Sequence, residues 1–294
     1  MITISKPGSR LLPHFLAAAS VSIWGFTFVS TKMLIAEGLS PVNIFFYRFL
    51  LAYACILLLS RNRLFADNIR DELMMAAAGL SGGSLYFIAE NSALGITYAS
   101  NVALIICTAP LFTMMLSRLF FKTPLRKGML IGSLTALAGV AMVVFNGSVN
   151  MGINPLGDFL TFIAAILWAI YCIILKITGK RYSTLFITRK VFFYGLVSAA
   201  LYMALSGKQL DLHLLLRPIV SANLLFLGLF ASMLCYLMWN SAVKSLGAEY
   251  AANYIYVVPL VTIIASVIIL GEPFTMLTAA GTACIIGGVY LAER

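Results

Sequence analysis

Charged residues are scarce in this chain of 294 residues, where Asp, Glu, Lys and Arg together make up 10%. A typical soluble domain has about 25% charged residues. Hydrophobic residues reach 62%, and the mean hydropathy is +1.00. Because so few charges cannot cover a water-exposed surface, a soluble globular fold is excluded for most of the chain. We expect a multi-pass protein of the cell (inner) membrane, with the lipid bilayer as the partner of its apolar surface.

Side chains that bind metals or perform covalent chemistry are also few. The sequence has two histidines, and its five cysteines stand singly in apolar runs without a CxxC pair. Four aspartates fall in expected loops or at span ends: Asp67, Asp71, Asp158 and Asp211. No G-x-x-x-x-G-K-[ST] loop is present for ATP. We therefore expect no enzyme, no metal site and no cofactor.

The net charge of +10 does not indicate nucleic acid as a partner. The basic residues lie in short clusters between apolar runs, a pattern that sets orientation in membrane proteins. With a cytoplasmic N-terminus, these fall on the cytoplasmic side: Lys6, Arg10, Arg61, Arg63, Arg70, Arg118, Lys122, Arg126, Lys127, Lys176, Lys180 and Arg181. Of the opposite loops, 35–42 and 146–156 contain no Lys or Arg, and 206–220 contains only Lys208 and Arg217. Both termini are therefore predicted to be cytoplasmic.

Ten apolar runs are long enough to cross a bilayer, which takes about 20 residues per helix. They lie at roughly 13–35, 42–60, 72–91, 98–118, 127–146, 156–177, 186–206, 220–242, 248–270 and 275–292. A backbone in lipid must satisfy its own hydrogen bonds, so these runs are expected to be helices. The predicted fold is an all-α integral membrane protein with ten transmembrane helices.

The second half of the sequence repeats the first. A shift of 149 residues superimposes many identical residues, and a shift of 144 does so near the start of each half. The pairs are Asn91-Ser92-Ala93 with Asn240-Ser241-Ala242, Ala99 with Ala248, Pro110-Leu111 with Pro259-Leu260, Pro124 with Pro273, Gly132 with Gly281, Gly139-Val140 with Gly288-Val289, Trp24 with Trp168 and Lys32 with Lys176. We predict two five-helix repeats, at 1–147 and 148–294. Since five is odd, the second repeat is inverted, an arrangement typical of secondary transporters with a substrate site near the midplane.

Short motifs recur in a fixed order over residues 13–292. They are Trp24-Gly25, Pro41, Tyr47-Arg48-Phe49-Leu50, Ala93-Leu94, Tyr98-Ala99-Ser100, Pro110, Gly271-Glu272-Pro273, Gly281 and Gly287-Gly288-Val289. In this order and spacing the chain resembles the drug/metabolite transporter superfamily, and within it the ten-helix EamA-type transporters. The resemblance implies transport of small polar metabolites, often amino acids or related compounds, without ATP. One departure is Lys122-Thr123, where the family usually has Gly-Glu after the fourth span.

Within this class we expect an exporter of amino acids or related compounds that works by alternating access around a midplane cavity. The alternatives are a nucleotide-sugar or phosphorylated-metabolite antiporter of the same superfamily, and a solute channel. A phosphorylated solute would need several cations in the cavity, and the sequence offers only Arg48 and, further along, Arg189 and Lys190. This scarcity favours a neutral or zwitterionic solute.

Glu90 lies inside the third span, where a carboxylate is costly unless it faces the bundle interior, a partner or water. It is a candidate proton-coupling residue, and Tyr86 lies one helical turn before it on the same face. The other interpretation is structural, with the acid near the outer end of the span and hydrogen-bonded to Asn91 or a neighbouring helix. In the second repeat, Trp239 stands in its place.

The candidate substrate-binding residues are aromatic or polar residues within the spans: Trp24, Arg48, Tyr86, Asn101, Trp168, Tyr171, Asn253 and Tyr254. Arg48 either binds a substrate carboxylate or ties its span to carbonyls or to Glu90, and we favour the structural role. Trp24 and Trp168 correspond across the repeats, and either line a cavity or anchor their helices at the membrane interface.

Pro110 and Pro259 occupy corresponding places in spans four and nine. A proline removes one helical hydrogen bond and kinks the helix, and matching interruptions in two repeats are typical of a binding region. We predict that both are hinges, with a plain packing kink as the alternative. Glycines in spans five and ten predict close helix packing, either within the molecule or at a homodimer face, so a monomer and a homodimer both fit the sequence.

Overall fold

The computed structural model describes residues 11–59, 64–97, 99–124, 126–144, 154–207, 209–261 and 276–293. Within these ranges the secondary structure is helical and no strand occurs, which confirms the predicted all-α class for the described part of the chain.

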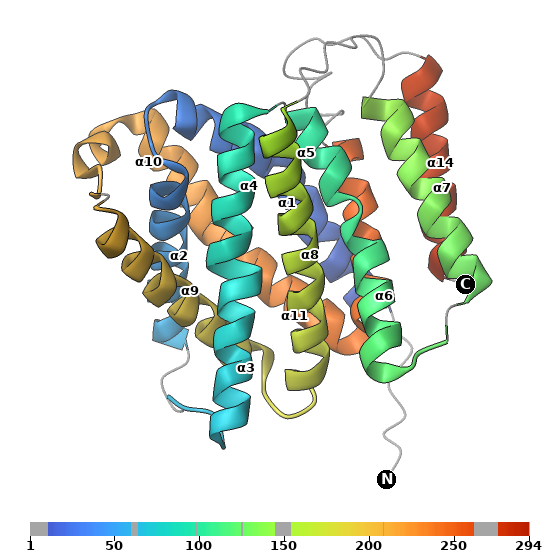
Figure 1. Cartoon of the computed structure of the whole chain (residues 1–294), viewed down its shortest axis with the longest axis horizontal. Helices are drawn as coiled ribbons and strands as arrows, with labels where there is room; N and C mark the ends of the chain where they lie inside the picture. Colours follow the sequence, from blue (N-terminus) through green and yellow to red (C-terminus); the bar gives the residue numbers. More distant parts are fainter. Residues whose placement is uncertain are drawn as a thin grey trace.

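The two halves contribute similar series of helices (Figure 1). The first half comprises α1 (Leu11–Ala36), α2 (Pro41–Leu59), α3 (Ile69–Gly79), the π-helix η2 (Leu80–Ser84), α4 (Leu85–Ile96), α5 (Ala99–Ile106), α6 (Ala109–Phe121) and α7 (Lys127–Val144). The second half comprises α8 (Pro155–Thr178), α9 (Thr184–Ser206), the 3-10 helix η3 (Leu212–Leu216), α10 (Pro218–Leu225), the π-helix η4 (Phe226–Leu234), α11 (Cys235–Leu246), α12 (Ala248–Asn253), the 3-10 helix η5 (Tyr254–Val257) and α14 (Met276–Glu293).

Most of the predicted spans coincide with helices of the structure. Seven helical stretches are long and apolar enough to cross a membrane: Leu11–Ala36, Pro41–Leu59, Ile69–Ile96, Val102–Phe121, Pro155–Thr178, Thr184–Ser206 and Pro218–Leu246. Shorter apolar helices at Lys127–Met142 and Ala279–Ala292 coincide with the fifth and tenth predicted runs. The ninth run, 248–270, extends beyond residue 261 and so lies partly outside the described residues, and Gly271-Glu272-Pro273 lies wholly outside them. The number of ten spans therefore stays a prediction.

Several helix boundaries follow local sequence signals. The side chains of Asn68, Asn154 and Ser183 accept a hydrogen bond from the backbone N–H of the third residue that follows, at the starts of α3, α8 and α9. Such caps satisfy amide groups that a helix start leaves unpaired. Pro155 occupies the first turn of α8, where its missing N–H costs nothing. Gly207 ends α9 with a φ of +65°, a conformation that glycine adopts without strain.

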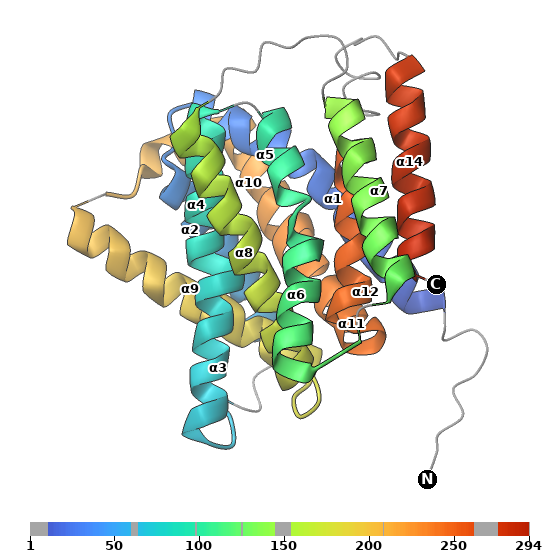
Figure 2. The same ribbon diagram turned by 45° about the vertical axis from the view of Figure 1, so that its right-hand side comes forward.

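The helices of each half pack mainly on helices of the other half. Helix α1 packs against α11, α2 against η4 and α9, α3 against α9, α4 and α6 against α8, and α7 against α14. Figure 2 shows α7 and α14 as a neighbouring pair at one side of the bundle. The core of the molecule thus lies between the two halves, and any cavity in it is lined by both.

Glycine brings α7 and α14 into close contact. A Cβ atom on Gly132 would lie 2.4 Å from the Gly288 carbonyl oxygen, and one on Gly288 would lie 2.5 Å from the Ala136 nitrogen. Both distances are far shorter than a van der Waals contact, so these positions have no room for a side chain. The predicted close packing of small residues is therefore found within the molecule.

Adjacent glycines of α14 allow a matched test of this packing. We expect Gly288→Leu to lower the Tm of the purified protein markedly, because overpacking costs about 1–3 kcal/mol and here the obstacle is backbone. Gly287→Leu is the control, since a Cβ there would meet no atom within 4 Å. The Tm of both variants in detergent is the measurement, and equal Tm values would contradict the packing.

Two π-helices occupy equivalent places in the repeats, and the sequence did not predict them. A shift of 149 carries η2 (Leu80–Ser84) onto residues 229–233, inside η4. In η2 the backbone of Gly83 leaves the helical region, with φ −125° and ψ −108°. A Cβ atom on Gly82 would lie 2.3 Å from the ring of Tyr171. Because π-bulges are frequent at functional sites, these two segments direct attention to the space between them.

Candidate functional site

A central cavity lies between the two halves. Its lining residues come from α1, α2, α4, α5, α8, η5 and the residue after η5: Trp24, Thr27, Phe28, Arg48, Tyr86, Phe87, Glu90, Ile106, Trp168, Ile255 and Val258. The cavity volume is about 40 Å³, which holds only a few water molecules. A metabolite of amino-acid size needs more room, so side chains or helices must move before one can bind.

Aromatic rings form one wall of this cavity. The rings of Trp24 and Trp168 meet edge to face, with centroids 5.2 Å apart and an interplanar angle of 89°. Tyr86 packs on Trp168 at 5.1 Å, and Tyr171 packs on it at 5.2 Å. Trp239 lies 5.2 Å from Trp24. We call these five residues, which come from α1, α4, α8 and α11, the aromatic wall. Trp24, Tyr86 and Trp168 line the cavity, and Tyr171 and Trp239 pack behind them.

Glu90 and Arg48 bring one negative and one positive group to the same cavity. The Glu90 carboxylate accepts a hydrogen bond from the Tyr86 hydroxyl at 2.6 Å, and the residue is 6% exposed. Arg48 is 2% exposed, and its Nε donates to the Ser232 Oγ at 2.8 Å. The guanidinium carbon lies 4.3 Å from the centre of the Phe87 ring, in cation–π contact.

Each charged group is thus held by a partner of its own. No ion pair joins Glu90 to Arg48 in the described part of the chain, although the two are close enough to interact electrostatically. Asn91, the other expected partner of Glu90, donates instead to the Pro41 carbonyl at 3.1 Å. Charged groups at membrane depth face the bundle interior and mark solute or ion pathways.

The two π-helices receive matching hydrogen bonds from the opposite half. The Tyr236 hydroxyl donates to the Gly82 carbonyl in η2. The Trp24 indole Nε1 donates to the Ala231 carbonyl in η4 at 2.9 Å. A shift of 149 relates Gly82 to Ala231, so the same carbonyl is capped in each repeat. A π-turn leaves carbonyls without their usual helical donor, and a ring from the other half supplies one.

The repeated Asn-Ser-Ala also connects helices. In the second repeat, Asn240 accepts from the Tyr171 hydroxyl at 2.7 Å and donates to the Thr188 hydroxyl at 2.8 Å. This anchors Tyr171 behind Trp168. Trp239, which stands where the first repeat has Glu90, is fully buried in the aromatic wall. The two copies of the motif therefore face the same region with an acid and a ring.

The predicted site residues divide into two groups. Trp24, Arg48, Tyr86, Glu90 and Trp168 line the central cavity, and their predicted roles in binding or coupling remain proposals. The others do not line it. Tyr171 is buried behind Trp168, and Asn253 lies 3.4 Å from the Ser133 hydroxyl. Tyr254 shares a 2.7 Å hydrogen bond with the His14 Nδ1, and the side chain of Asn101 is outside the described part.

Both prolines lie beside breaks in helical geometry. Pro110 is in the first turn of α6, directly after the turn at Cys107–Thr108 that separates it from α5. Pro259 follows η5, where the chain tightens into a 3-10 helix. Ile106 and Val258, which border these breaks, line the cavity. Movement at either break would therefore reshape the cavity, and the hinge role itself stays a prediction.

Sequence reasoning missed Ile255, Tyr236 and Trp239. The shift of 149 relates them to Ile106, Phe87 and Glu90, all of which line the cavity. Applying the repeat to Glu90 gives Trp239, whereas Ile255 and Tyr236 correspond to residues that were not candidates themselves. Ser232 had no such signal, because Gly83 stands at its counterpart.

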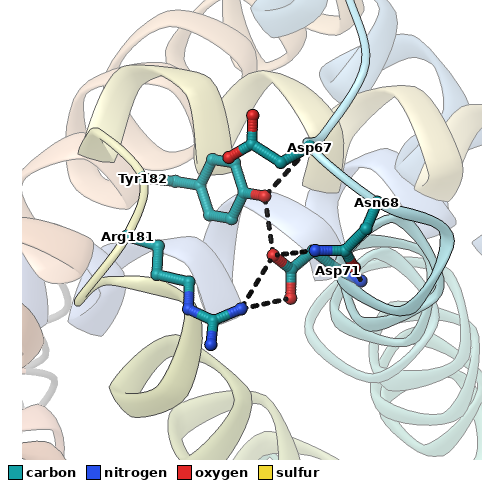
Figure 3. A network of polar contacts seen from close by, with 5 residues as sticks. All are labelled: Asp67, Asn68, Asp71, Arg181 and Tyr182. Carbon is teal, nitrogen blue, oxygen red and sulfur yellow. Dashed lines mark hydrogen bonds and ion pairs between the residues drawn. The ribbon is translucent and has the colours of Figure 1, made fainter.

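A polar network joins α3 to the loop between α8 and α9 (Figure 3). The Asp71 carboxylate accepts hydrogen bonds from the Tyr182 hydroxyl at 2.7 Å, from Asn68 Nδ2 at 3.1 Å and from Arg181 Nη1 at 3.2 Å. The backbone N–H of Asp67 donates to the Tyr182 hydroxyl at 3.0 Å. Burial raises the pKa of Tyr182, which keeps it a neutral donor. This network ties the two halves together at the end of the bundle.

Lys190 belongs to a neighbouring ion pair and not to the cavity. Its ammonium and the Tyr194 hydroxyl both bind the Glu72 carboxylate. Neither Lys190 nor Arg189 is among the described residues that line the central cavity. Arg48 is therefore the cation that the central cavity offers within the described part of the chain.

A second, larger cavity of about 300 Å³ opens where α6 ends and α7 begins. It is lined by Met114, Thr123, Pro124, Arg126, Met129, Lys176, Leu246, Gly247, Glu249 and Tyr250. We call this the basic-end cavity, and the end of the bundle that contains it the basic end. The ends of α6 and α8 and the starts of α3, α7 and α9 meet at this end (Figure 1).

Several proteins of similar sequence are named as transporters. The EamA-like transporter family model matches residues 11–145 and 155–293. An uncharacterized transporter of Archaeoglobus fulgidus is 29% identical over 282 residues, which cover 95% of this chain and 96% of that protein. The uncharacterized transporter YyaM of Bacillus subtilis is 29% identical over 271 residues, 86% of this chain and 85% of its own.

A more distant relative carries a more specific name. A probable terminal-alkyne amino-acid exporter of Streptantibioticus cattleyicolor is 25% identical over 226 residues, which cover 76% of this chain and 74% of that protein. One solved crystal structure, 20% identical in sequence, matches with a TM-score of 0.72 and covers 98% of this chain and 97% of its own. That similarity shows the same fold.

Proposed function

The chain belongs to the EamA-like transporter family and is a multi-pass membrane transporter, and from this premise we propose that it exports a small zwitterionic solute of amino-acid type. Transport proceeds by alternating access around the central cavity. The observation that carries the proposal is the presence of Glu90 and Arg48 in one aromatic-lined cavity, each with its own partner.

The charges of the cavity favour a zwitterion over other solutes. A cationic solute would be attracted by Glu90 and repelled by Arg48. An anionic solute would be attracted by Arg48 and repelled by Glu90. A zwitterion can place its ammonium group near Glu90 and its carboxylate near Arg48, which satisfies both buried charges at once. The aromatic wall adds a face for the ammonium group through cation–π contact and an apolar surface for a side chain.

The small volume of the central cavity agrees with a carrier and not with an open pore. A cavity of about 40 Å³ admits a few water molecules, so the solute has to be admitted by a rearrangement. In inverted-repeat transporters one repeat rocks against the other around a midplane site. We propose that Pro110 and Pro259, at the breaks beside Ile106 and Val258, are the hinges of this movement.

We propose that the basic end faces the cytoplasm, as the positive-inside rule requires. Arg118, Lys122, Arg126 and Lys127 lie on the adjoining ends of α6 and α7, and Lys180 and Arg181 follow α8. In this orientation both termini are cytoplasmic, and the ten spans form two inverted repeats, 1–147 and 148–294, in the inner membrane.

We propose that Glu90 couples transport to protons. Its carboxylate binds either the ammonium group of the solute or a proton, and the two compete for the same oxygens. When the solute leaves to the outside, a proton takes its place and is carried inward, so the proton gradient drives export. Tyr86 holds the carboxylate in position through its 2.6 Å hydrogen bond.

A phosphorylated metabolite is the second candidate, and the described cations support it less well. Lys190 is engaged by Glu72, which leaves Arg48 alone to hold a phosphate group. The amino-acid exporter of Streptantibioticus cattleyicolor supports the zwitterion instead, because its name assigns it an amino-acid derivative.

Counterflow in proteoliposomes tests the proposal. Vesicles are loaded with an unlabelled solute and diluted into buffer that contains a trace of the same solute in labelled form. The solutes tested, one at a time, are leucine, phenylalanine, isoamylamine, phenethylamine and glucose 6-phosphate. We expect labelled leucine or phenylalanine to accumulate transiently above equilibrium, and the amines and the sugar phosphate to do so weakly or not at all. Uptake that only equilibrates indicates a channel, and counterflow of glucose 6-phosphate supports the second candidate.

A further inference from the structure

The basic-end cavity and the central cavity lie along the same helices. Trp168 lines the central cavity and Lys176 the basic-end cavity, eight residues apart on α8, or about 12 Å along a helix. Glu249 lines the basic-end cavity and Ile255 the central cavity, six residues apart along α12 and η5. The shortest route from the basic end to the central cavity would therefore lie between α8 and α12.

An ion pair between Lys176 and Glu249 joins the two helices on either side of this route. The Lys176 ammonium lies 2.5 Å from the Glu249 Oε1 and donates to the Ser117 hydroxyl at 2.9 Å. Ser117 also donates to Glu249, so α6, α8 and α12 are joined at one point. One turn further inward, Cys172 and Asn253 are buried, and Asn253 Nδ2 has no partner among the described residues. A buried amide donor without a partner is costly.

Arg126 is the free cation of the basic-end cavity. It lines the cavity, and its guanidinium group makes no hydrogen bond or ion pair with any residue of the described ranges. The side chains of Thr123 and Tyr250 add hydroxyl groups to the same lining. Glu249, which also lines the basic-end cavity, supplies a negative charge and is paired with Lys176. The lining can therefore bind a carboxylate at Arg126 and direct an ammonium group toward Glu249.

We propose that the basic-end cavity is a second binding site, where Arg126 receives the carboxylate of the solute before it passes the Lys176–Glu249 pair. The cavity volume of about 300 Å³ suits a small zwitterion, whereas the central cavity in this state does not. This inference rests on the proposed transport of a zwitterion, and adds where the solute binds first and which group recognises it.

The repeat supports a site at this end and not at the other. A shift of 144 relates Lys176 to Lys32, near the opposite end of the bundle, but a shift of 149 places Ser100 where the second repeat has Glu249. Lys32 has no ion pair with a described residue. Glu249, the acid paired with Lys176, thus has no acidic counterpart in the first copy. This difference agrees with a solute that binds first at the basic end.

Arg126→Gln is the first test, with Lys127→Gln as its matched control. Both variants remove one exposed cation from the basic end, and only Arg126 lines the cavity. We expect Arg126→Gln to raise the KM for leucine and phenylalanine about tenfold, because it removes a charge-assisted contact with the carboxylate. The KM for isoamylamine or phenethylamine, which lack the carboxylate, should be unchanged wherever transport of them is measurable. An equal effect in both variants, or none in either, would overturn the proposal.

A binding measurement keeps the test independent of transport. Thr123→Cys places a thiol in the cavity lining, and its rate of labelling by a charged maleimide is measured in detergent, with the parent chain as background. We expect leucine and phenylalanine to slow this labelling several-fold, the corresponding amines not to, and Arg126→Gln to remove the protection. Protection by phosphatidylglycerol and not by amino acids would assign Arg126 to the membrane surface and overturn the proposal.

The two proposals fail in different ways. If no amino acid gives counterflow but leucine still protects Thr123→Cys, the proposed transport is wrong and the binding site stands. If counterflow is present while protection is absent and Arg126→Gln has the wild-type KM, the central site stands and the basic-end site is wrong.

Discussion

Arg48→Gln is expected to change the preferred solute from a zwitterion to an amine cation. Without the guanidinium group, the central cavity keeps the negative charge of Glu90 and the aromatic wall, which together suit an ammonium group alone. The carboxylate of leucine would then meet Glu90 without a compensating cation, and like charges at close range cost several kcal/mol. We expect the ratio of leucine to isoamylamine counterflow rates to fall by about 100-fold, which corresponds to about 2.7 kcal/mol.

The control is a buried cation outside the cavity. Lys190→Gln breaks the pair with Glu72 and should leave the ratio unchanged, whatever it does to stability. The Tm of each purified variant shows whether it is folded, because Arg48 also ties α2 to Ser232. A folded Arg48→Gln protein that loses both solutes equally would make Arg48 a structural residue, the role that the sequence favoured.

Glu90→Gln is expected to separate exchange from proton coupling. Glutamine has nearly the shape of a protonated glutamate but cannot release a proton, so a pH gradient should no longer drive transport. Counterflow needs no proton movement and should persist, with a KM about tenfold higher because the ammonium group loses its charged partner. The measurements are leucine counterflow at equal pH on both sides, and leucine accumulation driven by an imposed pH gradient.

Tyr86→Phe serves as the companion variant. It removes the hydroxyl that binds Glu90 and keeps the acid, so pH-driven accumulation should survive with an altered pH dependence. Wild-type behaviour of Glu90→Gln in both assays would leave Glu90 with a structural role. Loss of counterflow as well as accumulation, in a folded protein, would place Glu90 in solute binding and not in coupling alone.

Much of the fold follows from the sequence because a bilayer leaves few choices. Apolar runs of about 20 residues must be helical in lipid, and the shift of 149 residues relates one half to the other. The family match over 11–145 and 155–293 and the seven span-length helices agree with that prediction. Hydrophobic periodicity and segment length do not predict how the two halves pack together, because that packing depends on side chains far apart in the sequence.

The two π-helices are a feature that could not be predicted from the sequence. A π-turn is unfavourable by itself and is stabilised here by donors from the opposite half, Tyr236 for Gly82 and Trp24 for Ala231. Those donors lie 154 and 207 residues away, so no local pattern signals them. The glycines of η2 were visible in the sequence, but the need for Gly82 was not. Glycine is required there because the ring of Tyr171 packs where a Cβ atom of Gly82 would be.

The candidate site was predicted best where both copies carry a distinctive residue. Trp24 and Trp168 were found as a repeated pair, and their rings are in contact in the cavity lining, with centroids 5.2 Å apart. Asn253 and Tyr254 were selected as polar and aromatic residues within a span, and their side chains contact Ser133 and His14. Residue type and position in a helix do not reveal which neighbour a side chain meets, so their predicted role in binding stays a prediction.

The two halves of this molecule contain corresponding helices, but its chemistry is divided between them. Both charged groups of the central cavity come from the first copy, where Arg48 and Glu90 stand opposite Phe192 and Trp239 of the second. At the corresponding positions the second copy has aromatic rings. Two copies of a similar helix arrangement can thus differ in chemistry, with the charged groups in one copy and rings in the other. A charged solute in the central cavity would therefore meet different groups on its two sides, even where the helices of the two copies correspond.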